Sequence, residues 1–119
     1  MILLVEDDED VREMLAFTLR CWGYKVDVVK DGKAALAALE KTRPCLVILD
    51  LYMPGMNGWK VMESRKLDGL PVCVITALEG PTPENAIATL YKPFEASALL
   101  AVAAQYCGHA TVPPPPPVG

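Results

Sequence analysis

Short apolar runs alternate with amphipathic stretches along most of this chain, and their spacing predicts the order of its elements. Apolar runs of four to eight residues between turn residues are typical of strands buried in a parallel sheet. Such runs cover residues 2–5, 45–51 and 70–77. Residues 24–29 alternate between apolar and polar, and residues 87–91 offer a further short run. The pattern therefore predicts five strands.

A helical period separates the first two of these strands. The apolar face follows i, i+3, i+4, i+7, i+8 and i+11, a stripe along one side of a helix, and consists of Val11, Met14, Leu15, Thr18, Leu19 and Trp22. Acidic residues stand before this helix, where negative charge is favourable, and Gly23 stands where a terminating glycine belongs. Both ends of the first helix are thus marked in the sequence.

Three further helices follow from the same reasoning. Asp31 is the expected N-cap of a helix over residues 32–41, which ends before Pro44. Residues 59–66 predict a short helix, and an amphipathic stretch from Phe94 to about residue 108 predicts the last one. Strands that alternate with helices in this way indicate a parallel sheet with helices on both faces.

Composition narrows the class of protein. The chain has 119 residues, enough for one domain, and 52% of them are hydrophobic, which argues against disorder. The net charge of −4 argues against a nucleic-acid-binding surface. The sequence offers neither an apolar run near membrane-spanning length nor a signal-peptide pattern. We therefore expect a cytoplasmic location.

The four cysteines and the last residues carry separate expectations. No two cysteines form a C-x-x-C pair, and each lies in an apolar neighbourhood, so we expect buried free thiols in a reducing compartment rather than a zinc site; they are Cys21, Cys45, Cys73 and Cys107. Residues 109–119 include five consecutive prolines, which favour an extended tail or linker. We expect His109 to be a surface residue, and a domain boundary at residue 108.

Polar side chains stand where the predicted strands end. Glu6 and Asp7 follow the first strand, Asp50 ends the third, Thr76 ends the fourth and Lys92 follows the fifth. Ligands of an open parallel sheet bind at the carboxyl ends of its strands. The sequence therefore predicts one site that combines three carboxylates, a hydroxyl and an amine.

The opening run of five acids suggests what that site binds. Two like charges about 4 Å apart repel by roughly 4 kcal/mol at an effective dielectric near 20. A hard cation such as Mg²⁺ would relieve this repulsion at Glu6, Asp7 and Asp50, and Asp8 to Asp10 would lie in the first helical turn. With Lys92 and Thr76, the cation would form a cradle for a phosphoryl group, and a carboxylate such as Asp50 can act as the nucleophile.

The stretches "ILLVEDD", "LVILDLYMPGMNG", "VCVITA" and "YKPF", in this order, resemble the receiver domain of two-component response regulators. The resemblance covers residues 1 to about 108. It implies a flavodoxin-like α/β fold, a doubly wound (βα)5 with a five-stranded parallel sheet. It also implies a phosphoprotein that accepts a phosphoryl group from a histidine kinase or histidine phosphotransfer protein, and that is not a turnover enzyme.

The resemblance also implies residue roles. Asp50 resembles the phosphoacceptor, Asp7 the direct metal ligand and Glu6 its water-mediated partner. The backbone carbonyl of Tyr52 is expected to complete the Mg²⁺ ligands. Thr76 resembles the hydroxyl residue that moves toward the phosphoryl group, and Lys92 the lysine that pairs with it. The peptide bond after Lys92 is expected to be cis.

Two departures from the family pattern bear on output. The segment between Thr76 and Lys92 is short and contains two prolines, so we expect the fourth helix to be missing or reduced to about one turn. The family usually has an aromatic residue three positions before the lysine, where this chain has Thr89. Tyr91 stands one position before the lysine, and we expect it on the opposite side of the strand.

Three functions remain open at this point. The first is a Mg²⁺-dependent phosphorylation switch at Asp50, coupled to an output domain or protein partner. The second is an atypical receiver that binds partners constitutively, whether or not it is phosphorylated. The third, a metal-dependent phosphatase or nuclease, lacks a visible second nucleophile or general acid.

Overall fold

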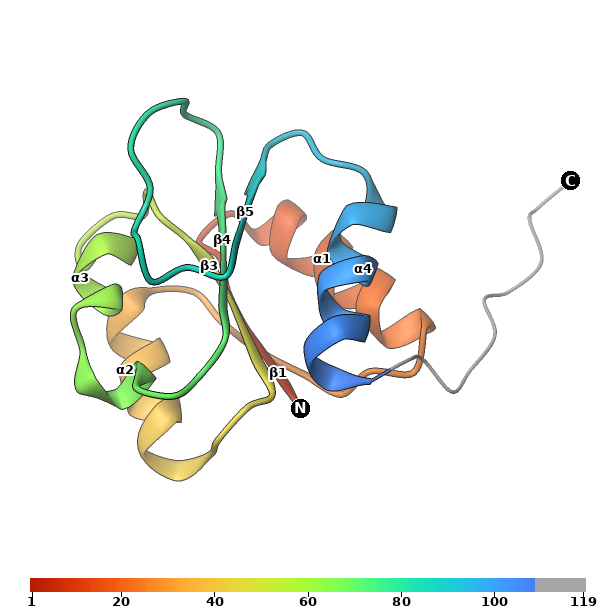
Figure 1. Cartoon of the computed structure of the whole chain (residues 1–119), viewed down its shortest axis with the longest axis horizontal. Coiled ribbons are helices and arrows are strands. Elements are labelled where there is room, and N and C mark those ends of the chain that lie inside the picture. Colours follow the sequence, from red (N-terminus) through yellow and green to blue (C-terminus); the bar gives the residue numbers. More distant parts are fainter. Residues whose placement is uncertain (109–119) are drawn as a thin grey trace, which may run out of the picture.

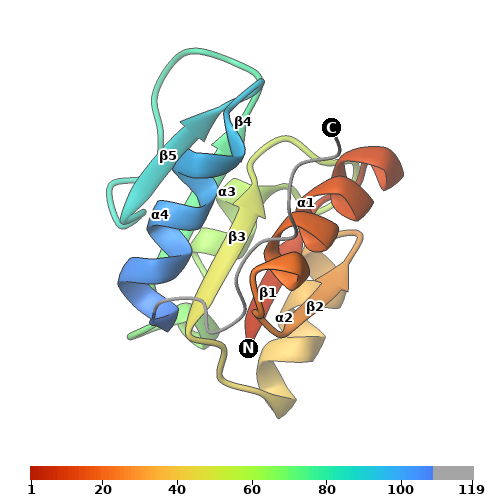
Figure 2. The same ribbon diagram turned by 90° about the vertical axis from the view of Figure 1, so that its right-hand side faces the viewer.

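The computed structural model describes residues 1–108, which fold around one parallel sheet (Figures 1 and 2). The tail at residues 109–119, and with it the expectation for His109, lies outside the described residues. The sheet order is β2-β1-β3-β4-β5. The strands are β1 (Ile2–Val5), β2 (Val26–Val29), β3 (Leu46–Asp50), β4 (Val72–Thr76) and β5 (Ala88–Tyr91).

Helices cover both faces of the sheet, which confirms the doubly wound arrangement (Figure 1). One face packs against α1 (Glu9–Cys21) and α4 (Ala96–Cys107). The other packs against α2 (Gly32–Lys41), α3 (Gly58–Met62) and the short 3₁₀ helix η1 (Arg65–Leu67). The third helix is shorter than expected, because its predicted second half is a separate 3₁₀ turn.

Helix caps explain why α1 and α2 begin where the sequence indicates. The Asp8 side chain accepts a hydrogen bond from the Val11 amide at 3.0 Å, and Asp31 accepts one from the Ala34 amide at 2.7 Å. Each bond satisfies a donor that the first helical turn leaves free. The bounds of α2 agree residue by residue with those predicted from the sequence.

The central strands are buried on both faces. Leu3 and Val5 of β1 pack toward α2 and α3, whereas Ile2 and Leu4 pack toward α1 and α4. Side chains of a strand alternate between the two faces of its sheet. Because helices cover both faces of the sheet, every side chain of a central strand is buried. The sequences of these strands are therefore continuous apolar runs.

No helix lies between Thr76 and Ala88, so the expected loss of the fourth helix is complete in this fully described segment. The helix called α4 here occupies the place after β5, where the family has its fifth helix (Figure 2). The Lys92–Pro93 peptide bond is cis, as the resemblance implied.

The expectation that Tyr91 lies across β5 from Thr89 is wrong. Ala88 and Leu90 pack against the cluster that includes α1 and α4. Residues two positions apart share a face of a strand. Thr89 and Tyr91 therefore lie together on the opposite face, with Tyr91 46% exposed.

The cysteine prediction is also wrong in part. Cys45 and Cys107 form a disulfide, and only Cys21 and Cys73 are free cysteines in the described part of the chain. Cys73 is fully buried, whereas Cys21 is half-buried. The prediction failed because the pairing joins the start of β3 to the end of α4, and local sequence does not show that these two points meet.

No helix within residues 1–108 has the length and apolar character needed to cross a bilayer.

Candidate phosphoacceptor and metal site

The carboxyl ends of four strands bring the predicted site residues to one edge of the sheet. Glu6 extends β1, since its amide donates to the Val29 carbonyl at 3.1 Å. Asp50 and Thr76 are the last residues of β3 and β4. Lys92 follows β5, and its amide donates to the Thr76 carbonyl at 2.7 Å.

Lys92 connects two of the acids. Its ammonium donates to Glu6 Oε1 at 2.5 Å and to Asp50 Oδ2 at 3.2 Å. The carboxyl of Glu6 is fully buried and Asp50 is 4% exposed. A buried charge must be paired or bound to a metal, and the ammonium supplies part of that compensation.

Burial dominates the chemistry of Glu6. Removal from water, and secondly the interaction with Asp50, raise the pKa of Glu6 to about 8 against the opposing effect of Lys92. Burial alone would lower the pKa of Lys92, but its hydrogen bond to Glu6 and the charge of Asp50 raise that pKa. Ionisation of all three carboxyl groups would place more negative charge at the site than its single lysine balances.

The five opening acids divide into two groups. Glu6 and Asp7 join Asp50, and one carboxylate oxygen from each of the three lies within 4.8 Å of the others. Asp8 is the cap of α1, and Glu9 and Asp10 are exposed in its first turn. The second group lies in water near the positive end of the helix dipole, so only the first group needs a compensating cation.

One atom of the site lacks a partner. Glu6 Oε2 is buried and accepts no hydrogen bond within residues 1–108. A buried carboxylate oxygen without a partner is costly. Together with the neighbouring oxygens of Asp7 and Asp50, this atom forms the set of hard oxygen ligands that Mg²⁺ prefers.

The loop after β3 turns back closely over Asp50. The Tyr52 amide donates to Asp50 Oδ1 at 3.1 Å, and the Gly58 amide donates to the Leu51 carbonyl at 2.8 Å. A Cβ atom at Gly58 would lie 2.4 Å from the Asp50 carbonyl oxygen. Only glycine allows this approach. The role of the Tyr52 backbone carbonyl as a metal ligand stays a prediction.

The hydroxyl of Thr76 is engaged with the loop that follows β4. It accepts a hydrogen bond from the Leu78 amide at 3.1 Å. Thr76 is fully buried. The hydroxyl therefore lies at the junction between the site edge and the segment that replaces the fourth helix.

Sequence reasoning missed Arg12. Its guanidinium donates to the backbone carbonyls of Glu6 at 3.0 Å and Asp7 at 3.3 Å. These bonds fix the turn that carries both acids and place a positive charge beside them. A basic residue within two helical turns of an acidic run is the signal that would have pointed to this role.

Comparison with known proteins agrees with the motifs. Residues 2–104 match the model of the family described as the response regulator receiver domain. The DNA-binding response regulator MtrA of Mycolicibacterium smegmatis is 46% identical over 77 residues, which are 64% of this chain and 34% of that protein. The sensory transduction protein RegX3 of Mycobacterium bovis is 43% identical over 77 residues, which are again 64% of this chain and 34% of that protein. The matched residues thus span about a third of the length of these curated relatives.

Solved structures share the fold. The chemotaxis protein CheY4 of Vibrio cholerae superimposes with a TM-score of 0.78 at 30% identity, over 88% of this chain and 96% of that one. The response regulator TrrA of Thermotoga maritima, solved with Mg²⁺ and BeF, gives a TM-score of 0.79 at 28% identity over the same shares. The receiver domain of the sensor histidine kinase PA1611 of Pseudomonas aeruginosa was solved with magnesium in its active-site cleft. It gives a TM-score of 0.78 at 28% identity, over 90% of this chain and 96% of that one.

Proposed function

Because this chain belongs to the response regulator receiver domain family, we propose that Asp50 is its phosphoacceptor and that the domain works as a Mg²⁺-dependent signalling switch. The observation that carries the proposal is the contact of Lys92 with Asp50 at 3.2 Å, beside the three-carboxylate cluster. A nucleophilic carboxylate, a paired cation and hard oxygen ligands are the groups that phosphoryl transfer requires.

Glu6, Asp7, Asp50 and the Tyr52 carbonyl would hold the metal. The three carboxylates fit this role, because they are close together and Glu6 Oε2 is buried without a partner in the described residues. When bound, Mg²⁺ neutralises charge on the phosphoryl oxygens.

The residues of the chain then have distinct tasks. A carboxylate oxygen of Asp50 attacks phosphorus in the phosphohistidine of the donor protein. An acyl phosphate bond forms while the phosphorus–nitrogen bond breaks and its electron pair stays with the imidazole. Lys92 keeps Asp50 in place before transfer and can pair with a phosphoryl oxygen afterwards. Thr76 can turn its hydroxyl proton from the Leu78 carbonyl, to which it donates at 3.4 Å, toward a phosphoryl oxygen.

We propose a histidine kinase or histidine phosphotransfer protein as the donor, with the domain acting as an acceptor that is consumed stoichiometrically rather than as a turnover enzyme. An output domain or protein partner would read the phosphorylated state. The relatives named as DNA-binding are longer than the matched segment, and the net charge of −4 supports assigning no nucleic-acid binding to this domain itself. The proposed location is the cytoplasm.

The test uses a small phosphodonor such as acetyl phosphate with Mg²⁺. We expect intact mass spectrometry to show one added phosphoryl group on the wild type and on Asp27→Asn, an exposed control on β2. Asp50→Asn should show none. Modification that persists in Asp50→Asn, or a wild type that is never modified under conditions that modify a known receiver, would contradict the assignment.

A second candidate function is constitutive partner binding. It is favoured by the absence of a helix over residues 77–87 and by Thr89 in place of an aromatic residue. In that case the Asp50→Asn variant would bind its partner as well as the phosphorylated wild type does. Binding that requires phosphorylation would exclude it.

A further inference from the structure

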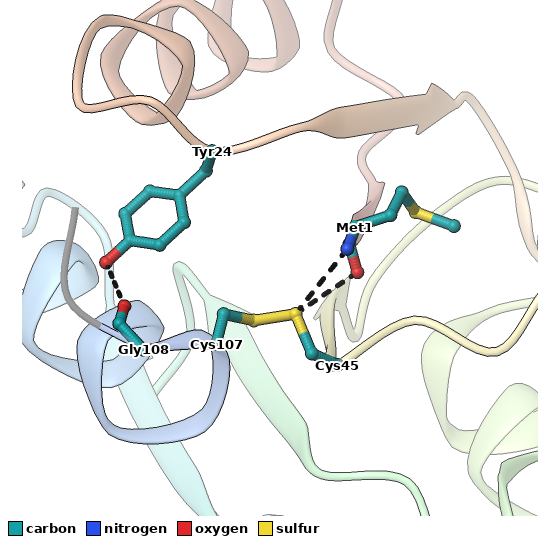
Figure 3. Close-up of a disulfide and its surroundings, with 5 residues drawn as sticks. All are labelled: Met1, Tyr24, Cys45, Cys107 and Gly108. Carbon is teal, nitrogen blue, oxygen red and sulfur yellow. Dashed lines mark hydrogen bonds between the residues drawn. A yellow bond between two sulfur atoms is a disulfide. The ribbon is translucent and has the colours of Figure 1, made fainter. Parts of the chain in front are cut away.

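The end of the last helix carries a feature that the phosphorylation site does not use. The Cys45–Cys107 disulfide joins residues 62 positions apart, with their Cα atoms 5.4 Å from each other (Figure 3). It lies at the edge of the sheet where β3 begins, close to the dark-blue end of α4 in Figure 2. Asp50 is at the other end of β3, about 16 Å from Cys45 at the usual rise per strand residue.

The two halves of this disulfide differ in how firmly the fold holds them. The Cys45 amide donates to the Met1 carbonyl at 2.9 Å, which extends the pairing of β3 with β1 by one residue. Cys45 is therefore anchored in the sheet whether or not its sulfur is bonded. Cys107 has no such anchor, because it is the last residue of a helix.

The last turn of α4 has few other attachments. The buried residues of α4 are Leu99 and Ala103, and none lies beyond Ala103. Past that point the chain is attached by half-buried Tyr106 and by a hydrogen bond from the Tyr24 hydroxyl to the Gly108 carbonyl at 2.8 Å (Figure 3). An exposed hydrogen bond between neutral groups contributes only about 1 kcal/mol. The disulfide is thus the strongest restraint on this turn.

Neither cysteine of the disulfide is enclosed by the core, and the reduced state also fits the structure. Cys45 and Cys107 are each half-buried rather than enclosed. Cys45 Sγ lies 3.3 Å from the Met1 carbonyl oxygen, so a Cys45 thiol would have an acceptor in place. The fold can therefore accommodate either the disulfide or two thiols without moving β3.

We propose that Cys45 and Cys107 form a reversible redox site that tethers the end of α4 to the sheet and releases it on reduction. Oxidation by a disulfide such as glutathione disulfide forms one sulfur–sulfur bond in the protein. The two thiol protons and two electrons pass to the oxidant, which leaves as two thiols. Reduction by a dithiol reverses the exchange. The site controls how firmly the chain up to residue 108 is held to the domain.

The free cysteines provide internal controls. Burial raises the pKa of the Cys73 thiol to about 12, so it should resist alkylation in the folded protein. Cys21 is half-buried and remains a thiol, so it should be alkylated in both redox states. Mass spectrometry after alkylation therefore distinguishes two additional labels on reduction from unspecific changes.

The test first equilibrates the protein in glutathione buffers from oxidising to reducing and counts alkylated cysteines. We expect Cys45 and Cys107 to change together within this range, in monomeric protein. Hydrogen exchange then compares the two states. Amides of residues 104–107 should exchange at least about tenfold faster after reduction, whereas β3 and β4 stay unchanged. Phosphorylation by acetyl phosphate should be equal in both states.

Matched variants complete the design. Cys45→Ser and Cys107→Ser should both show fast exchange in residues 104–107 without reductant, and neither should respond to it. Cys21→Ser should respond as the wild type does. The proposal is overturned if the pair stays reduced in the most oxidising buffer, stays oxidised in the most reducing one, joins two chains, or changes state without altering exchange at the end of α4.

Discussion

At the scale of single residues, Glu6 is the site carboxyl group whose ionisation the fold opposes most. It is fully buried, it shares Lys92 with Asp50, and one of its oxygens has no partner among the described residues. Its pKa near 8 reflects the cost of placing a charge in that environment. The residue that would help bind a metal is thus a source of instability without one.

This predicts how the metal-free protein responds to pH. The folded state retains the Glu6 proton up to about pH 8, whereas the unfolded chain loses it near 4.5. The unfolded state therefore binds fewer protons across this window, and the free energy of unfolding should fall as the pH rises from 4.5 to 8. The raised pKa of Lys92 acts only above its usual value of 10.5 and leaves this window unaffected.

Urea unfolding in chelator between pH 5 and 8 measures the effect, which should be on the order of a few kcal/mol. Glu6→Gln, which carries no titrating proton, should flatten the profile. Saturating Mg²⁺ should flatten it too, because the metal favours the ionised carboxylate. A wild-type stability that is level or rises over this range would contradict the interpretation.

Gly58 supplies a second prediction at this scale. A Cβ atom there would overlap the backbone of Asp50 and Leu51, which cannot move without disturbing β3. We expect Gly58→Ala to destabilise the protein by about 3 kcal/mol, the upper part of the range for overpacking.

Gly55→Ala is the matched control in the same loop, since a Cβ atom there has no neighbour within 4 Å. Its positive φ of 75° should cost only about 1 kcal/mol. Equal losses in denaturant melts would refute the role assigned to close approach.

At the scale of elements, the segment between β4 and β5 distinguishes this domain from its family. It contains no helix, and the Leu78 amide within it bonds to the hydroxyl of Thr76. On β5, Thr89 and Tyr91 share one face, so an aromatic residue is present on that face but two positions beyond the usual place. A conformational equilibrium shifts only through interactions that differ between its states.

We therefore predict a local response to phosphorylation. Beryllofluoride with Mg²⁺ should slow hydrogen exchange in residues 77–85, because engagement of Thr76 orders that loop. Exchange along α4 should stay within about twofold of the unmodified protein. The Asp50→Asn variant, treated identically, is the control. Large changes spread along α4 would show that an output relay to this helix survives.

At the scale of the whole molecule, the two edges of the sheet have separate tasks. The carboxyl edge carries the acids, Thr76 and Lys92, whereas the amino edge carries the disulfide (Figure 3). The central strands between them are fully buried. A rigid core of this kind keeps the two edges in place while each changes its own chemistry.

Global stability should depend on Mg²⁺. A ligand that binds only the folded state at ten to a hundred times its Kd stabilises that state by about 1.4 to 2.7 kcal/mol. Thermal melts with Mg²⁺ and with chelator should differ accordingly. Asp7→Asn should remove most of the gain and slightly raise metal-free stability, because a charge beside Glu6 and Asp50 is lost. Asp10→Asn, outside the cluster, should keep the gain. Identical wild-type melts would mean that the acids bind no metal.

The sequence by itself determined what depends on short stretches of chain. Helical spacing and the caps at Asp8 and Asp31 located α1 and α2, because the bonds involved lie within a few residues. Apolar runs located the strands, and parallel strands necessarily bring their carboxyl ends together. That constraint alone predicted the gathering of Glu6, Asp7, Asp50 and Lys92.

Only the tertiary structure decided what depends on distant segments. Cys45 and Cys107 meet because α4 packs across the sheet beside the start of β3, and nothing near either cysteine encodes that approach. Arg12 reaches the carbonyls before its helix through a particular side-chain direction, which periodicity does not specify. Side-chain contacts such as these are fixed by register and packing of the whole core, whereas local patterns specify only which face of an element is apolar.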